Sequence, residues 1–363
     1  MKKQLLTLLK IIAFLAVGLT ILYFLYQSQN ASYQKQCAVN GIPSDQCNLL
    51  KKLADDFRKT NPFWIILIVA ITLLSHLIRA LRWNMLIKPL GATPRVINSF
   101  LSVIIGFFAN LGIPRIGELV RASTLSRYED IPTEKLVGTV VVDRIVDMVT
   151  FIGIVGFAFM LEFHTIYNKL ANLYAESMGT GPGSDHSKLI FIFVLLAVVF
   201  IAFLAYMYKK PENLVVKKIK GIISGVLEGV NAIRKLKNPW LFMFYTLVIW
   251  FCYYIVLYIC LPAFGPTHGL GLRAAVIIFV FGALGFIFPS PGGMGTYHWM
   301  IIQALLLYNV SEADGFSFAN IAYFSGQIFT NVLFGLVALI ALPIINSNYT
   351  PPHSLVNEAD SSL

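Results

Sequence analysis

The most constraining feature of this chain is a series of apolar stretches, each about as long as a bilayer is thick. A helix that spans the hydrocarbon core needs roughly 20 consecutive apolar residues. About seven stretches qualify, at 5–26, 62–87, 137–161, 189–208, 240–262, 273–288 and 319–345, with shorter apolar pieces at 96–113 and 296–309. Only 13% of the residues are charged, about half the share in soluble domains. The sequence therefore predicts an all-α polytopic integral membrane protein with one transmembrane domain over 1–345.

Basic residues are grouped between the apolar stretches, and they indicate the orientation of the chain. The formal net charge is +10, and an excess of Lys and Arg marks cytoplasmic loops. The segment 209–238 is therefore predicted to be cytoplasmic, like the N-terminus, and to bind anionic headgroups as an amphipathic helix. A solvated loop is the alternative. Its lysines are Lys209, Lys210, Lys217, Lys218 and Lys220. Nucleic-acid binding is not expected, and the tail 346–363 is predicted to be disordered.

Two cysteines lie in the polar loop that follows the first apolar stretch. Cys37 and Cys47 are ten residues apart, and a disulfide between them is expected if this loop lies outside the cytoplasm. Two free thiols are the alternative, and the sequence leaves both open. No CxxC motif or paired histidines accompany them, so no metal or other cofactor is expected.

Two Pro- and Gly-containing breaks interrupt the apolar pattern, each after a short apolar segment and before a new helix. Lipid tolerates a broken backbone only where protein or water satisfies its polar groups. Both breaks are therefore predicted to be re-entrant or unwound, in an arrangement that would suit an inverted repeat. Paired breaks of this kind are typical of transporter sites, and helix N-termini there favour anions. Two kinked structural helices are the alternative, and either break would make its neighbours a hairpin in place of a span. The candidate substrate-binding residues are Asn110, Pro114, Arg115, Gly117, Glu118, Arg121, Pro291, Gly292, Gly293, Gly295 and His298.

Charged residues also occur near and inside the predicted spans. Asp143, Arg144 and Asp147 open the span at 137–161, where each charge costs about 2.5–3.5 kcal/mol. We expect them to point inward and to pair with one another or with Arg115, Glu118 or Arg121, in a structural network, a functional one, or both. Arg79 and Arg82 are expected to snorkel to the cytoplasmic interface. His76 is expected to pack near an interface.

At these motifs the sequence resembles the lysylphosphatidylglycerol synthase transmembrane region, or flippase-like domain, family. The resemblance rests on Arg79 to Trp83, the P-x-x-G-E element within Asn110 to Arg121, Asp143 to Asp147, and Pro289 to Gly295. It implies a multi-pass protein of the bacterial inner membrane that moves a lipid between leaflets. The soluble aminoacyl-transferase domain of the synthases is absent here, so synthase activity is not expected. The family's second motif usually continues to a Glu, where this chain has Thr296, Tyr297 and His298. Either His298 substitutes for that Glu or the substrate differs.

These observations together predict a lipid flippase-like transporter and not an enzyme. Its cargo would be a phospholipid or a polyprenyl-phosphate-linked lipid, and assembly as a homo-oligomer is left open. A first alternative is a membrane-embedded transferase that uses Asp143 or Glu118 as a base. A second is a non-transporting scaffold for envelope lipid enzymes.

Overall fold

In the computed structural model, the described residues are part of 23–38 together with 47–177, 233–288 and 290–351. This part of the chain is α-helical and contains no strand, which confirms the predicted all-α membrane fold. Contacts between the helices group the chain into two compact units, 1–144 with 236–363, and 145–235. The single domain expected over 1–345 stays a prediction.

Four continuous helical segments in the described residues are long and apolar enough to cross a membrane. They are α3 with its short extension (Pro62–Leu90), the first part of α6 (Thr133–Glu162), α9 (Pro239–Ala263), and α12 to α13 (Glu312–Ile345). Exposed apolar side chains such as Ile66, Phe251 and Ile340 cover their outer faces, as expected of surfaces that contact lipid. These segments match four of the predicted spans.

The other three predicted spans have different outcomes. The stretch 189–208, and nearly all of 5–26, lie outside the described residues. The stretch 273–288 is wrong as a span, because helix α10 (Leu272–Gly285) has only 14 residues. At 1.5 Å per residue it is about 21 Å long, well short of the roughly 30 Å hydrocarbon core.

The second unit contains the later part of α6 (Thr133–Ser177). The predicted spans at 137–161 and 189–208 leave 162–188 as a loop between them, but the helix continues to Ser177 with a kink at Glu162. The basic segment 209–238 lies outside the described residues apart from 233–238.

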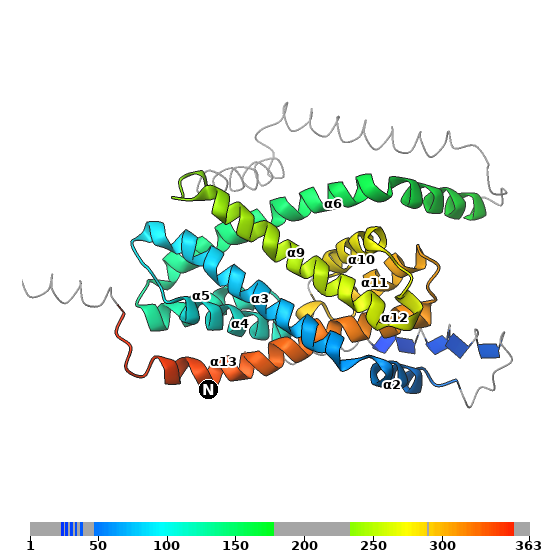
Figure 1. Cartoon of the computed structure of the whole chain (residues 1–363), viewed down its shortest axis with the longest axis horizontal. Helices are drawn as coiled ribbons and strands as arrows, with labels where there is room; N and C mark the ends of the chain where they lie inside the picture. The colour runs from blue at the N-terminus through cyan, green and yellow to red at the C-terminus, as the bar shows by residue number, and fades with distance from the viewer. Residues whose placement is uncertain are drawn as a thin grey trace, which may run out of the picture. The chain divides into compact units, whose positions relative to one another are not determined.

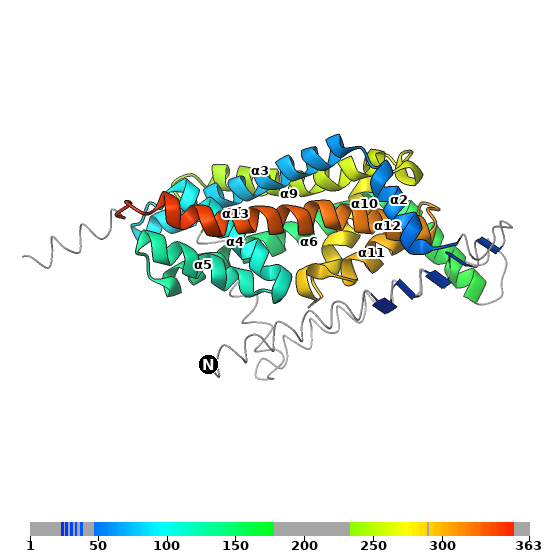
Figure 2. The same cartoon turned by 90° about the horizontal axis from the view of Figure 1, so that it is seen from below.

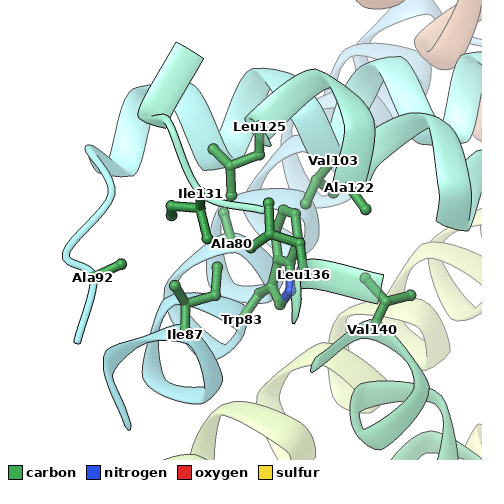
Figure 3. Packing of buried hydrophobic residues seen from close by; sticks show 10 residues of the cluster. All are labelled: Ala80, Trp83, Ile87, Ala92, Val103, Ala122, Leu125, Ile131, Leu136 and Val140. Atoms are coloured by element: carbon green, nitrogen blue, oxygen red, sulfur yellow. The ribbon is translucent and has the colours of Figure 1, made fainter. Parts of the chain in front are cut away.

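A cluster of buried apolar residues around Trp83 forms part of the core of the first unit (Figure 3). Trp83 is fully buried on α3 (Pro62–Ile87), and its indole N–H donates to Thr139 Oγ1 at 2.8 Å. Leu125 and Ala122 pack against it from α5 (Ile116–Glu129), and Val103 does so from α4 (Val96–Gly112). Elsewhere in this unit α3 lies alongside α9, and α13 (Thr330–Ile345) lies alongside α4 (Figure 1).

Two short helical hairpins pack against the long helices. The first joins α4 to α5, and the second joins α10 to α11 (Thr296–Leu306). Glycines allow both close approaches: a Cβ on Gly117 would lie 2.1 Å from the Gly106 carbonyl oxygen, and one on Gly285 would lie 2.6 Å from Tyr297 Cα. Each hairpin is therefore held by backbone contact that a larger residue would block.

Helix α2 (Leu49–Lys59) is an amphipathic helix that packs on α12 (Glu312–Tyr323). Leu49 packs with Ala313 and Phe316 in a buried apolar cluster. Lys52 Nζ contacts Asp314 at 2.8 Å. Just before this helix, a disulfide joins Cys37 to Cys47.

The chain just after α13 is anchored to the start of α4 and the end of α5. Asn346 and Asn98 exchange amide hydrogen bonds of 2.9 and 2.8 Å, and Tyr349 donates to Glu129 Oε2 at 3.0 Å. Burial, with the Glu129 carboxylate adding to it, raises the pKa of Tyr349 to about 12. The sequence predicts disorder from 346 onward, whereas side-chain hydrogen bonds hold the described part of this tail in place. Residues 352–363 lie outside the described part.

Candidate functional site

The first break is a three-residue turn between α4 and α5. Pro114 lies in this turn, and Arg115 adopts a left-handed conformation with φ of 64°, which costs a non-glycine residue about 1–2 kcal/mol. The Asn110 side chain accepts the Gly117 N–H at 2.7 Å, so one of the amides that open α5 already has a partner. The anion site expected at this N-terminus therefore has fewer free donors than the sequence predicts.

The second break, between α10 and α11, is longer and depends on glycine. Gly292, Gly293 and Gly295 all have positive φ, which glycine adopts at little cost. Thr296 Oγ1 donates to the Gly285 carbonyl at 2.8 Å and closes the turn. His298, at the third position of α11, accepts the Gly295 N–H through Nδ1 at 3.4 Å.

The tips of the two hairpins meet. Leu111, at the end of α4, lies close to Gly292. A Cβ added to Gly292 would be 3.0 Å from Leu111 Cδ2. The Arg115 guanidinium donates to the Ile287 carbonyl at 3.5 Å. Figure 2 shows the hairpins end to end, with α5 and α11 on the same side. Two breaks that are more than 170 residues apart in the sequence thus form one site.

Three arginines surround one buried aspartate beside the first hairpin. Asp143 Oδ1 accepts from Arg82 at 2.6 Å, and its Oδ2 accepts from Arg121 at 2.9 Å and Arg79 at 3.3 Å. Arg79, Arg82 and Asp143 are at most 2% exposed. The prediction that Arg79 and Arg82 snorkel to the interface is therefore wrong. Burying a charge is costly unless it is paired, and Asp143 supplies the pairing that holds these side chains inside.

The neighbouring charges form a second pair nearer the surface. Arg144 contacts Glu118 Oε1 at 2.7 Å, with side chains 41% and 25% exposed. Arg121 stacks on Trp83, with its guanidinium carbon 4.8 Å from the ring centre. Two of the expected pairings are therefore present, Asp143 with Arg121 and Arg144 with Glu118. Asp147 is buried and belongs to the second unit.

His298 also lines a cavity of about 250 Å³ beside the second break. Asn320 and Tyr323 of α12 contribute to the same cavity. His76 lies elsewhere, stacked on Phe107 and hydrogen bonded to Asn331 at 3.2 Å, so it packs in the interior and not near an interface.

The structure brings most of the predicted site residues together, and it adds several that the sequence did not indicate. Arg79 and Arg82 were missed as network members, although the argument that turned Asp143 inward applies equally to them. Asn320 and Tyr323 carry no motif, and only the packing of α12 beside the second break reveals them. Among the described residues, no three His, Cys, Asp or Glu side chains are placed to hold a metal ion. The five lysines from Lys209 to Lys220 lie outside the described part.

Comparison with known proteins agrees with these motifs. The family described as the lysylphosphatidylglycerol synthase TM region matches residues 49–343. UPF0104 membrane protein MJ1595 of Methanocaldococcus jannaschii is 37% identical over 106 residues, which are 28% of this chain and 32% of that protein. UPF0104 membrane protein MJ1078 of the same organism is 25% identical over 240 residues, which are 63% of this chain and 94% of that protein. The match thus spans about a third of the first relative's length and nearly all of the second's. No solved structure matches the chain.

Proposed function

We propose that this chain, which belongs to the lysylphosphatidylglycerol synthase transmembrane region family, moves a phospholipid or a lipid-linked intermediate between the leaflets of a membrane. It is a multi-pass membrane protein, and membership of this family suggests a function connected with membrane lipids. Transport between leaflets, and the absence of a chemical reaction, are the specific parts of the proposal.

The meeting of the two hairpin tips is the observation that carries the proposal. Neither α10 nor α11 is long enough to cross a bilayer, so their hairpin must turn within the membrane or at its edge. A turn of this kind exposes backbone polar groups, which lipid does not satisfy. Two such turns in contact resemble the paired broken helices that form substrate sites in transporters.

Arg115 is the cation best placed to meet a lipid phosphate. It is exposed at the first tip, and its guanidinium makes only a long contact of 3.5 Å with the Ile287 carbonyl. Arg121, the other candidate from the sequence, is buried and bonded to Asp143. We therefore assign phosphate binding to Arg115, and we assign to the arginine cluster the role of fixing the first hairpin against α3.

The charges also bear on the transferase alternative. That reaction would use Asp143 or Glu118 as a base, but Asp143 accepts hydrogen bonds from three guanidinium groups and Glu118 pairs with Arg144. Both carboxylates are therefore already engaged in ion pairs within the protein. These pairings favour transport over catalysis.

The proposed orientation follows from the disulfide and the basic segments. A disulfide persists where the environment is oxidising, so the loop with Cys37 and Cys47 is placed outside the cytoplasm. The N-terminus and the segment 209–238, whose lysines would bind anionic inner-leaflet headgroups, are placed on the cytoplasmic side. We place the protein in the cell membrane.

A dithionite-quenching assay in proteoliposomes tests the proposal. The protein is reconstituted with fluorescently labelled phosphatidylglycerol, and dithionite destroys the label in the outer leaflet only. We expect the protected fraction to fall below the half seen in protein-free vesicles, and Arg115→Gln to slow this loss. Arg273→Gln is the matched control, because Arg273 is an exposed arginine at the far end of α10 from the tips. A wild-type protein that leaves the protected fraction unchanged overturns the proposal.

A further inference from the structure

The cavity beside the second break has walls of two kinds. Its polar wall is formed by His298, Asn320 and Tyr323, and its apolar wall by Phe57, Met294, Phe324 and Ile328. His298 and Tyr323 are at most 5% exposed, whereas Phe324 is 47% exposed. The cavity is thus polar on its inner side and apolar toward the surface.

The hydrogen bonds of the polar wall fix which groups remain available. His298 Nδ1 accepts the Gly295 N–H, so the neutral ring carries its proton on Nε2. Asn320 Nδ2 donates one amide proton to the Phe316 carbonyl at 2.8 Å. Tyr323 donates its hydroxyl proton to the Gly292 carbonyl at 3.0 Å. The second amide proton of Asn320 and the lone pairs of the Tyr323 oxygen remain, one a donor and the other an acceptor.

We propose that this cavity binds the uncharged, hydroxyl-bearing headgroup of a membrane lipid, namely a sugar or a polyol. A hydroxyl group donates and accepts at once, and it therefore satisfies both kinds of free group on the polar wall. A phosphate would seek cations, but no Lys or Arg is among the seven lining residues. An ammonium headgroup would likewise find no carboxylate there.

The size and the surroundings of the cavity fit a headgroup whose chains stay in the bilayer. A volume of about 250 Å³ lies just below the range of roughly 300–1,000 Å³ typical of pockets for drug-sized ligands, so it suits one sugar or glycerol unit. Phe324 and Ile328 belong to a π-helical segment (Phe324–Phe329) within the last span, and such segments are frequent at functional sites. Phe57 closes the cavity from α2 and stacks edge-on against Phe324 at 5.7 Å.

This inference deepens the proposed function by naming the class of lipid that is carried. The hydroxylated end of such a lipid would enter the cavity at the second tip, and where the lipid also carries a phosphate, that phosphate would meet Arg115 at the first. Binding of the headgroup in the cavity does not require transport, because binding alone would satisfy the polar groups of the cavity.

The test is a competition for binding, measured by native mass spectrometry of the purified full-length chain. The protein is offered equal amounts of monoglucosyl diacylglycerol, plain diacylglycerol and phosphatidic acid. We expect the glucosyl lipid to be retained about tenfold over diacylglycerol and to exceed phosphatidic acid at this site. Tyr323→Phe and Asn320→Leu should each remove most of this preference, because the first deletes the acceptor of the polar wall and the second deletes its donor.

Tyr254→Phe is the matched control, since Tyr254 also donates to a backbone carbonyl, that of Leu272 at 3.1 Å, but outside the cavity. It should keep the wild-type preference. Equal retention of the glucosyl and plain lipids, or a preference that neither cavity variant changes, overturns the inference. Preference for phosphatidic acid that depends on Asn320 does the same.

The dithionite assay, run on the same preparations, separates this inference from the proposed function. A protein that selects the glucosyl lipid through Asn320 but moves no lipid supports the binding site and contradicts transport. A protein that moves labelled phosphatidylglycerol but shows no selection supports transport and contradicts the binding site.

Discussion

Replacing Asp143 by Asn should destabilise the protein severely. One carboxylate accepts hydrogen bonds from three guanidinium groups at 2.6–3.3 Å, and all four side chains are at most 4% exposed. At an effective dielectric constant near 20, each charge pair at this range contributes about 4 kcal/mol of attraction. Much of this is offset by the cost of removing the charges from water, and breaking a buried pair typically costs about 3–5 kcal/mol. We expect Asp143→Asn to lower the free energy of unfolding by about 3–5 kcal/mol. The three positively charged guanidinium groups would then face one another without a carboxylate between them.

Thermal or denaturant unfolding of the detergent-purified protein, followed by tryptophan fluorescence, measures this loss. Glu118→Gln is the control, because it breaks an ion pair with Arg144 that is partly exposed and should cost at most about 1 kcal/mol. The double variant Asp143→Asn with Arg121→Met removes one guanidinium together with the carboxylate. It should be more stable than Asp143→Asn alone, which a double-mutant cycle detects as a coupling energy. If Asp143→Asn and Glu118→Gln shift unfolding equally, the cluster does not hold the hairpin as argued.

Three further outcomes are expected from other parts of the fold. Gly117→Ala should disrupt the first hairpin, because the added Cβ would lie 2.1 Å from the Gly106 carbonyl oxygen, and it should lower the yield of folded protein in size-exclusion chromatography. Gly138→Ala is the control and should behave like wild type, because Gly138 has open space around it. Reducing the disulfide between Cys37 and Cys47 should cost about 2–4 kcal/mol and speed proteolysis before α2, and equal digestion of both forms would contradict this. Tyr349→Phe removes the hydrogen bond to Glu129 and should cost about 1 kcal/mol, seen as faster hydrogen exchange at the end of α13; unchanged exchange would show that the anchor is not needed.

Local properties of the sequence were sufficient to predict the spans and the breaks. Runs of apolar residues fixed α3 and α9 to within a residue or two of their observed bounds, because a span requires a length of apolar chain that the sequence displays directly. The two breaks could also be predicted from the sequence, since Pro114 and the paired glycines Gly292 and Gly293 disfavour a continuous helix. The inward direction of Asp143 followed from the cost of a charge in lipid.

The local sequence does not determine the position of a side chain that depends on a distant partner. Arg79 resembles an interface residue in sequence, because it lies near the end of a span beside other basic groups. Its burial depends on Asp143, which is 64 residues away. The tail shows the same dependence, because Asn346 is polar and appears disordered in sequence but pairs with Asn98 across 248 residues.

The sequence by itself therefore determined that this protein is a membrane protein, where its helices break, and that Asp143 must turn inward. These properties follow from the transfer of each segment between water and lipid, which is a local quantity. Only the tertiary structure decided that the two broken hairpins meet tip to tip, that three arginines share Asp143, and that Asn320 and Tyr323 complete a cavity beside the second break. Those arrangements depend on how helices far apart in the chain pack together, and a pattern of residues along the sequence does not contain that information.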